Sequence, residues 1–437
     1  MTKCYQDSFD FPPVKRRKVE LNFEGGDITS YAGVQLLSEV DKKLGLTKSI
    51  TQQLTDDRRQ KSCSYSLQEL IKQRVYALAL GHEDLIDHQE LRHDMAMQTA
   101  AGTDSTMASV STLHRLEQRA DRQTAIQLHE VLIEQFIQKH KVPPKELILD
   151  FDATDTPLHG EQEERFYHGY YDSYCYLPLY VFCGRDLLVS YLRPSNIDGA
   201  KHSWAILSLL VKALKAHWPD VNIIFRGDSG FCRWRMLSWC ERHNVGYIVG
   251  IAKNPRLLEA SKLWRDVAEQ CYEAFGKKQR IFASVYYAAS SWDKKRRVIV
   301  KAEHTSKGSN PRFVVTNLEQ SDRHLYDNVY CARGDMENRI KDQQMGLFSH
   351  RTSCHKWWPN QFRQLLSGIA YTLLEGLRTF CLRGTFLEKA LPNTIRIKLL
   401  LIGAIIIKNT RRIKIMMSES YPHQTLFTSV VTNLNSS

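Results

Sequence analysis

None of the ten cysteines forms a C-x-x-C pair, and no apolar run is long enough to cross a bilayer. A tetrahedral zinc site therefore has no support in the sequence, and scattered cysteines of this kind are typical of a reducing compartment. The longest apolar run, residues 399–407, has nine residues, whereas a membrane-spanning helix needs about 20, so we expect a buried strand or helix there. The first 30 residues also lack an apolar segment, and we expect no secretory signal peptide.

The composition excludes several classes of protein as descriptions of the whole chain. With 437 residues, 43% hydrophobic and 25% charged, the chain is neither disordered, collagen-like nor a membrane bundle, and its length predicts two to four domains. The net charge of +12 favours a polyanionic partner, with nucleic acid first and an anionic membrane second. Most of the excess is C-terminal, because residues 351–437 hold twelve Lys and Arg against three Asp and Glu.

Breakers and changes of periodicity predict an α/β protein with six segments. No internal repeat or long low-complexity tract interrupts them. The segments are an irregular start (1–30), a helical DNA-binding domain (31–142), the first part of an α/β core (143–254), a β-rich insertion (255–325), the second part of the core (326–385) and a basic, mostly helical C-terminal region (386–437).

The N-terminal helices allow two interpretations. Ser66 and Glu69 form a capping box that predicts a helix start, and further helical patterns follow over 110–116 and 124–138. Small helical modules of this type bind DNA or serve as plain structural bundles. The basic stretch 13–19 is either a solvated loop or an arm that contacts DNA.

Acidic residues stand at the ends of two predicted strands. Asp150 and Asp152 lie two apart in the strand pattern 146–154, so both point to the same face, and Asp155 follows closely. Asp228 follows the apolar strand pattern 221–226. Active sites of α/β sheets commonly lie at such strand ends, although a single strand-end Asp is often only a turn or cap residue.

A third acid, Glu337, lies in a predicted helix. Arg333, Lys341 and Gln344 stand four residues before, four after and seven after it, on one helix face. Such a face is either solvated or serves metal and phosphate together. Two or three carboxylates from separate segments suffice to hold Mg²⁺, and two ions can activate both oxygens of a phosphoryl transfer.

These motifs resemble DDE transposases of bacterial insertion sequences. Asp152-Ala153-Thr154 is similar to the D-x-T motif of that family, and Asp228-Ser229-Gly230-Phe231 to its D-[AS]-G-[FY] motif. Tyr330, Arg333 and Glu337 match the Y-x2-R-x3-E-x6-K signature in type and spacing. Gln344 stands where the family has Lys, and Lys341 lies one helical turn earlier on roughly the same face.

The resemblance implies an RNase H-like core with a β-rich insertion before the third acid. It also implies that Asp152, Asp228 and Glu337 are the catalytic residues and the ligands of two divalent ions, Mg²⁺ or Mn²⁺. Asp150 is the rival for the first ligand. The DNA-contacting residues it implies are Tyr330, Arg333, Lys341 and Trp292, where Trp292 either stacks on a flipped base or is an ordinary packing residue.

The implied function is cut-and-paste transposition by metal-dependent strand cleavage and strand transfer. The expected partners are double-stranded DNA, both as inverted-repeat element ends and as target, and a second copy of the chain on DNA. No membrane and no small-molecule cofactor are expected, and the expected location is the bacterial cytoplasm, with the nucleoid. A standalone nuclease on the same core and a DNA-binding regulator that uses the N-terminal helices remain alternatives.

Overall fold

The computed structural model describes residues 8–436, which form two compact units. Unit 1 contains residues 8–51, 56–116 and 373–436, and unit 2 contains residues 52–55 and 117–372. These units divide the chain differently from the predicted segments. The C-terminal region joins the N-terminal helices in unit 1, whereas the last helix of the segment 31–142 belongs to unit 2.

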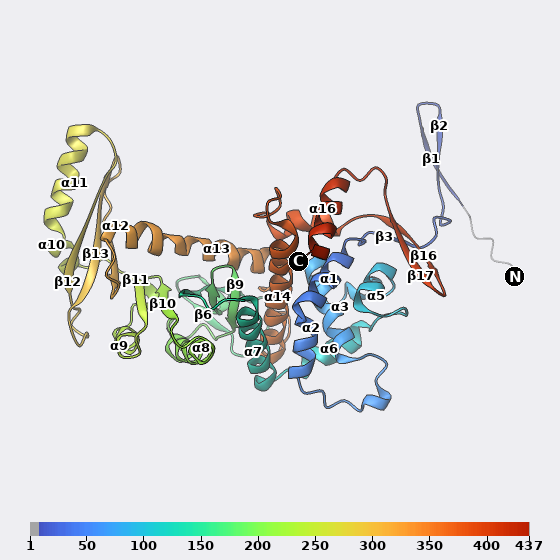
Figure 1. Ribbon diagram of the computed structural model, residues 1–437, viewed down its shortest axis with the longest axis horizontal. Helices are drawn as coiled ribbons and strands as arrows, with labels where there is room; N and C mark the ends of the chain where they lie inside the picture. Colours follow the sequence, from blue (N-terminus) through green and yellow to red (C-terminus); the bar gives the residue numbers. More distant parts are fainter. Residues whose placement is uncertain (1–7, 437) are drawn as a thin grey trace. The chain divides into compact units, whose positions relative to one another are not determined.

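Unit 2 is built on one mixed sheet with the strand order β12-β13-β15-β11-β10-β4-β8-β9 (Figure 1). Strands β4, β10 and β11 are parallel, with α8 leading from β9 into β10 and α9 connecting β10 to β11, whereas β8 pairs antiparallel with both β4 and β9. The bounds are β4 Glu146–Ala153, β8 Leu179–Cys183, β9 Asp186–Tyr191, α8 Ser203–His217, β10 Asn222–Gly227, α9 Trp234–Arg242 and β11 Gly246–Ile251.

The apolar segment 176–182, which has the pattern of a single strand, is divided between two sheets in the structure. Its first part ends β7 (Ser173–Tyr176), which pairs with β5 (Thr156–Pro157) and β6 (Phe166–His168) in a small separate sheet. Its second part is β8 in the main sheet. The division falls at Pro178, which has no N–H to donate to a strand partner.

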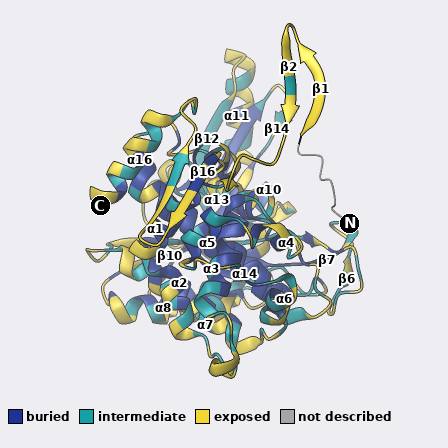
Figure 2. Ribbon diagram, turned by 90° about the vertical axis from the view of Figure 1, so that its right-hand side faces the viewer, coloured by how far each residue is buried: buried dark blue, intermediate teal, exposed yellow. Residues whose placement is uncertain are grey.

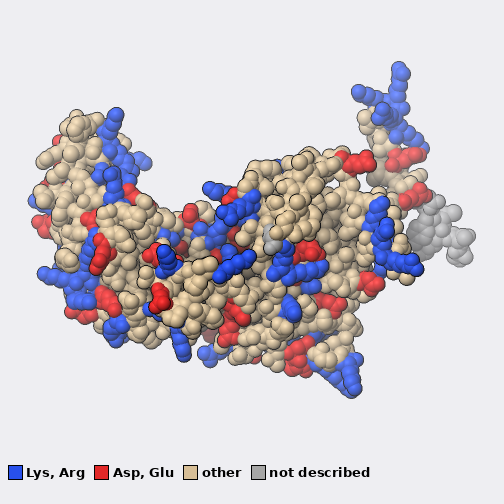
Figure 3. All heavy atoms as spheres, viewed as in Figure 1, with Lys and Arg blue, Asp and Glu red and all other residues tan. Residues whose placement is uncertain are grey.

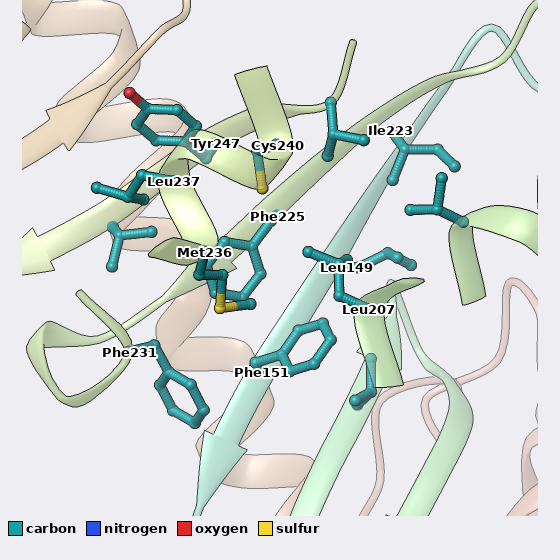
Figure 4. Packing of buried hydrophobic residues seen from close by; sticks show 14 of the residues in the cluster. Leu149, Phe151, Leu207, Ile223, Phe225, Phe231, Met236, Leu237, Cys240 and Tyr247 are labelled. Atoms are coloured by element: carbon teal, nitrogen blue, oxygen red, sulfur yellow. The ribbon is translucent and has the colours of Figure 1, made fainter. Parts of the chain in front are cut away.

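The largest apolar cluster of unit 2 lies on one face of the main sheet (Figure 4), and a smaller one with Ile224 and Ile248 lies on the other. Leu149 and Phe151 of β4 and Phe225 of β10 point into the largest cluster and meet side chains of α8 and α9. Helix α7 (Arg122–Lys139) contributes Phe136 to the same cluster. Because side chains alternate along a strand, the intervening acidic residues of β4 point to the opposite face.

The predicted β-type insertion continues the main sheet instead of forming its own. β15 pairs with β11, and Val298 and Val315 belong to the same apolar cluster as Leu149. Figure 1 shows helix α11 lying along β12 and β13. The bounds are α10 Pro255–Ala260, α11 Lys262–Phe275, β12 Gln279–Tyr287, β13 Arg296–Thr305, β14 Gly308–Ser309 and β15 Arg312–Thr316.

A nearly continuous helical stretch then runs over the other face of the sheet. It contains two π-helical turns, and ion pairs of Arg297 with Asp322 (2.6 Å) and of Arg280 with Asp327 hold it against the sheet. It consists of α12 Asp322–His324, the π-helix Leu325–Tyr330, the 3₁₀ turn Cys331–Arg333, α13 Gly334–Lys341 and the π-helix Asp342–Gly346. Helical structure thus begins at Asp322, well before Arg333, the first residue of the helix face predicted from the sequence.

Unit 1 contains most of the predicted N-terminal helices. The capping box is confirmed: the Ser66 side chain accepts from the Glu69 N–H, and Glu69 accepts from the Ser66 N–H. The helices are α1 Val34–Leu44, α2 Leu46–Gln53, α3 Leu67–Leu80, α4 His88–Leu91, α5 Met95–Ala101 and α6 Val110–Gln118, with a 3₁₀ turn at Gln60–Ser62. Of these, α2 and α6 extend a few residues across the division between the units.

The C-terminal region is less helical than predicted. The apolar run 399–407 ends a π-helix and enters β16, where Ile405 and Ile407 are 44% and 50% exposed instead of buried. Strands β16 and β17 form a hairpin that β3 extends. The elements are α15 Pro392–Ile395, the π-helix Arg396–Leu400, β16 Ala404–Asn409, β17 Arg412–Met417, α16 Gln424–Ser436 and, from the N-terminal segment, β3 Ile28–Thr29.

Residues 8–30 are also more regular than predicted. Strands β1 (Phe9–Val14) and β2 (Arg17–Leu21) form an exposed hairpin, drawn mostly yellow in Figure 2. The basic stretch 13–19 lies around its turn. Residues 1–7 of the predicted irregular start lie outside the described residues.

Helix α14 (Trp357–Leu377) and the π-helix that follows it (Arg378–Leu382) form a long, apolar helical stretch. Within the described residues, this stretch of 26 residues is the one helix with the length and composition to cross a bilayer. However, 83% of its most apolar window is buried in the protein, as is usual for a core helix.

Candidate active site

The first two acids of the predicted site lie at neighbouring strand ends. β4 and β10 run parallel with Asp150 opposite Arg226, so Asp152 near the end of β4 and Asp228 directly after β10 reach the same edge of the sheet. Asp228 also caps the 3₁₀ turn Ser229–Phe231, since its Oδ1 accepts from the Gly230 N–H at 2.8 Å.

Arg333 joins the third acid to the first. Its Nη1 lies 3.3 Å from Asp152 Oδ2 and its Nη2 lies 3.1 Å from Glu337 Oε1. The side chain of Asp152 is 14% exposed, whereas that of Glu337 is 51% exposed. One guanidinium therefore bridges a largely buried carboxylate on the sheet and an accessible carboxylate on α13.

The charges at this site interact strongly. Burial raises the pKa of Asp152 to about 6; the nearby Asp228 and Glu337 carboxylates add to this rise, and Arg333 opposes it. Burial alone would lower the pKa of Arg333, but the surrounding carboxylates, Asp152 first, raise it above its ordinary value. Asp152, Asp228 and Glu337 thus form one acidic group around a single cation.

Asp150, the rival for the first ligand, has a different environment. It is fully buried, and both of its carboxylate oxygens accept from Arg226, from Nε and from Nη2 at 2.7 Å. Arg226 also donates through Nη1 to the carbonyl of Val329, just before Tyr330. This ion pair joins β4, β10 and the helical stretch that carries Arg333, so the geometry gives Asp150 a structural position.

Tyr330 packs on β11 through a residue that the sequence analysis missed. A Cβ placed on Gly250 would lie 2.5 Å from the Tyr330 hydroxyl oxygen and 3.0 Å from the Ser229 nitrogen. Only glycine therefore allows the tyrosine to lie this close to the strand and to the Asp228 turn. The sequence signal was weak, because Gly250 stands inside an apolar strand pattern where a glycine commonly marks close backbone approach.

The remaining predicted residues lie less centrally. Lys341 is exposed on α13, and Gln344 donates to the Asp155 carbonyl at 3.1 Å, which fixes the loop after β4. The ring of Trp292 lies 5.6 Å from that of Tyr287, and the Arg296 guanidinium lies over it. These contacts are those of a packing residue, and stacking of Trp292 on DNA stays a prediction.

The chain matches a family described as Transposase DDE domain group 1 over residues 11–437. It belongs to this DDE transposase family. A search of curated proteins finds no match. Among solved structures, the chain is similar to a piggyBac transposase in a synaptic complex with hairpin DNA. The two sequences are 11% identical, the TM-score is 0.42, and the match covers 85% of this chain and 80% of that chain.

DDE transposases generally use divalent metal ions, and the three carboxylates are the candidate ligands in this chain. Among the described residues, no three acidic, His or Cys side chains stand close enough together to hold an ion as they are placed. The donor chemistry nevertheless fits, since Asp152, Asp228 and Glu337 offer only hard oxygen ligands. The Arg333 guanidinium already balances the charges of Asp152 and Glu337. A metal ion can take its place only if the guanidinium moves aside.

Proposed function

We propose that this DDE transposase cuts DNA at the ends of a bacterial insertion sequence and joins the freed ends to target DNA. The observation that carries the proposal is the convergence of Asp152, Asp228 and Glu337 on Arg333 at one edge of the sheet. A raised carboxylate pKa in a group of like charges is typical of a catalytic site.

The core of unit 2 supports an RNase H-like assignment. In the order β9-β8-β4-β10-β11, the parallel strands β4, β10 and β11 adjoin the antiparallel strands β8 and β9. Asp152 near the end of β4 and Asp228 directly after β10 stand at neighbouring strand ends. The third acid then comes from a helix after the insertion, as Glu337 does.

In this proposal Asp152, Asp228 and Glu337 hold two Mg²⁺ or Mn²⁺ ions. When bound, such ions activate an attacking oxygen and stabilise a leaving oxygen in phosphoryl transfer. Arg333 then turns from the carboxylates to a DNA phosphate, and Lys341 provides a second cation on the same helix. Tyr330, fixed by Gly250, holds the helical stretch and the Asp228 turn in register.

The proposed reaction has two steps. Water first hydrolyses a phosphodiester at the element end, and the freed 3′-hydroxyl then attacks a phosphodiester of the second strand or of target DNA. Both nucleophiles are oxygens, so no covalent enzyme intermediate forms. Two inverted-repeat ends react together, which favours a homodimer bound to DNA. The proposed location is the bacterial cytoplasm, with the nucleoid.

Separate substitutions of the three acids test the proposal. Asp152→Ala, Asp228→Ala and Glu337→Ala should each reduce Mg²⁺-dependent cleavage of an element end to background while the variants still bind the DNA. Asp335→Ala is the matched control, since this carboxylate lies on the same helix two residues from Glu337 and is 71% exposed. Full cleavage by the Glu337 variant would contradict the mechanism.

The same assay separates the alternatives. A standalone nuclease would cleave the element end but would not join the 3′-hydroxyl to target DNA. A DNA-binding regulator would bind without metal and cleave nothing. The buried, charge-coupled Asp152 favours an enzyme, because a regulator has no need of such a costly group.

A further inference from the structure

The hairpin of β16 and β17 in unit 1 concentrates positive charge without any acidic residue. Residues 404–417 contain Lys408, Arg411, Arg412 and Lys414 and no Asp or Glu. In Figure 3, Lys and Arg atoms gather where Figure 1 labels this hairpin. The proposed reaction does not use these residues.

The root of the hairpin is fixed. Ile405 pairs with Ile28 of β3, and Ile415 packs against a small core that contains Ala32 and Ile402. Lys408 Nζ donates to the Asp104 carbonyl at 2.7 Å and lies 3.4 Å from its carboxylate. Lys408 is therefore a structural anchor, and its charge is balanced.

The other three cations are free at the outer end. Arg411, Arg412 and Lys414 are exposed, and within residues 8–436 none of their side chains has an ion-pair partner. The strand register places Ile407 opposite Lys414 and Asn409 opposite Arg412. Since directly opposed residues share a face, Arg412 and Lys414 lie on the outward face beside the exposed Ile405 and Ile407.

We propose that this basic hairpin is a DNA-binding arm that contacts the phosphates of double-stranded DNA through Arg411, Arg412 and Lys414. The inference rests on the proposed function and adds a surface to it. A two-stranded ribbon fits the width of the major groove, and exposed isoleucines beside the cations can lie against sugars and base methyl groups. A second copy is a poorer occupant, because a symmetric contact would bring identical positive charges together.

Counterion release makes the expected effect measurable. Each phosphate contact contributes about −0.9 to the slope of the logarithm of the binding constant against the logarithm of the salt concentration. Loss of three contacts should therefore reduce the slope by about 2–3 and weaken binding by about 10–100-fold at moderate salt. The loss should be similar for different duplex sequences, since phosphate contacts carry no sequence information.

The test compares the wild type with three variants of the full chain on a random-sequence duplex of about three helical turns. Binding is measured in EDTA across a salt series. The first variant carries Arg411→Ala, Arg412→Ala and Lys414→Ala, and the second keeps the charge with Arg411→Lys, Arg412→Lys and Lys414→Arg. The matched control removes three exposed lysines of unit 2, Lys141, Lys145 and Lys212, by substitution with Ala.

The proposal expects a smaller salt slope only in the first variant, with its melting temperature unchanged. An unchanged slope in that variant, an equal loss in the control, or a loss of self-association without a loss of DNA binding would overturn it. Metal-dependent cleavage by the wild type is measured beside these assays. If the wild type binds and cleaves DNA but the first variant binds equally well, only the proposed DNA-binding role of the hairpin is wrong. If the wild type neither binds nor cleaves DNA, the proposed function fails.

Discussion

At the scale of single residues, the site region combines one buried carboxylate whose charge is only partly compensated with one that is fully paired. Asp152 is largely buried near two other carboxylates, and a single shared guanidinium only partly offsets that cost. Asp150, two positions earlier, is deeper but has both oxygens bonded to Arg226. Neighbouring positions on one strand face thus have opposite effects on stability, which leads to two predictions.

Asp152→Asn should stabilise the metal-free protein at neutral pH. An acid whose folded-state pKa lies above its unfolded-state pKa loses stability as the pH rises between the two values. With a folded pKa of about 6 against an ordinary 3.8, wild-type stability falls across that window, by about 2–3 kcal/mol. Urea unfolding at a series of pH values checks this. The advantage of the variant should vanish at low pH, and Asp335→Asn should show neither effect.

Asp150→Ala should destabilise unit 2 by about 3–5 kcal/mol, because it leaves the buried Arg226 without its partner. The paired change of Asp150→Leu with Arg226→Met should cost much less, since no buried charge then remains unpaired. Denaturant unfolding of both variants measures the difference. Equal losses for the two variants would show that the ion pair matters for its shape and not for its charge.

At the scale of elements, a helical stretch with two π-helical turns places Tyr330, Arg333 and Glu337 over the sheet. Such turns are rare and commonly occur at functional sites, because they re-aim side chains. Besides the ion pairs of Arg280 and Arg297, two contacts hold the stretch near Tyr330: the bond from Arg226 to the Val329 carbonyl and the approach of Tyr330 to Gly250.

Gly250→Ala should destabilise the protein and reduce cleavage, because the new methyl group meets the Tyr330 hydroxyl. Adding Tyr330→Phe removes the nearest clashing atom and should recover part of the stability. A double-mutant cycle on the unfolding free energy should give a coupling of about 0.5–3 kcal/mol. Strict additivity of the two changes would contradict the contact.

At the scale of the whole molecule, long-range pairing decides how the chain is divided. The insertion strands extend the main sheet of unit 2 through β15 and β11, and they share its apolar cluster. In unit 1, β3 near the start of the chain pairs with β16 near its end. Each of the two units is assembled from more than one segment of the chain.

The shared sheet predicts shared stability. Backbone amides of β13 near Val298 should exchange with solvent as slowly as those of β4 near Leu149, because both strands lose protection only when the cluster opens. Hydrogen exchange followed by mass spectrometry tests this. The exposed β1–β2 hairpin provides an internal control, since it should exchange fast. Early exchange of β13 alone would identify the insertion as an independently folding part.

Local sequence patterns determined much of this protein. Alternation along β4 predicted that Asp150 and Asp152 share a face, the capping box predicted the start of α3, and the spacing of Tyr330, Arg333 and Glu337 indicated the family. These features depend on neighbours in the chain, so periodicity and motif spacing are sufficient to predict them.

Tertiary structure alone decided the rest. The ion pair that occupies both oxygens of Asp150 depends on Arg226, which is 76 residues away from Asp150 in the chain. The need for glycine at position 250 depends on Tyr330, and the pairing of β16 with β3 joins segments from opposite ends of the described chain. Contacts between distant segments leave no periodic trace, so the burial and pairing of these residues become defined only when the chain is folded.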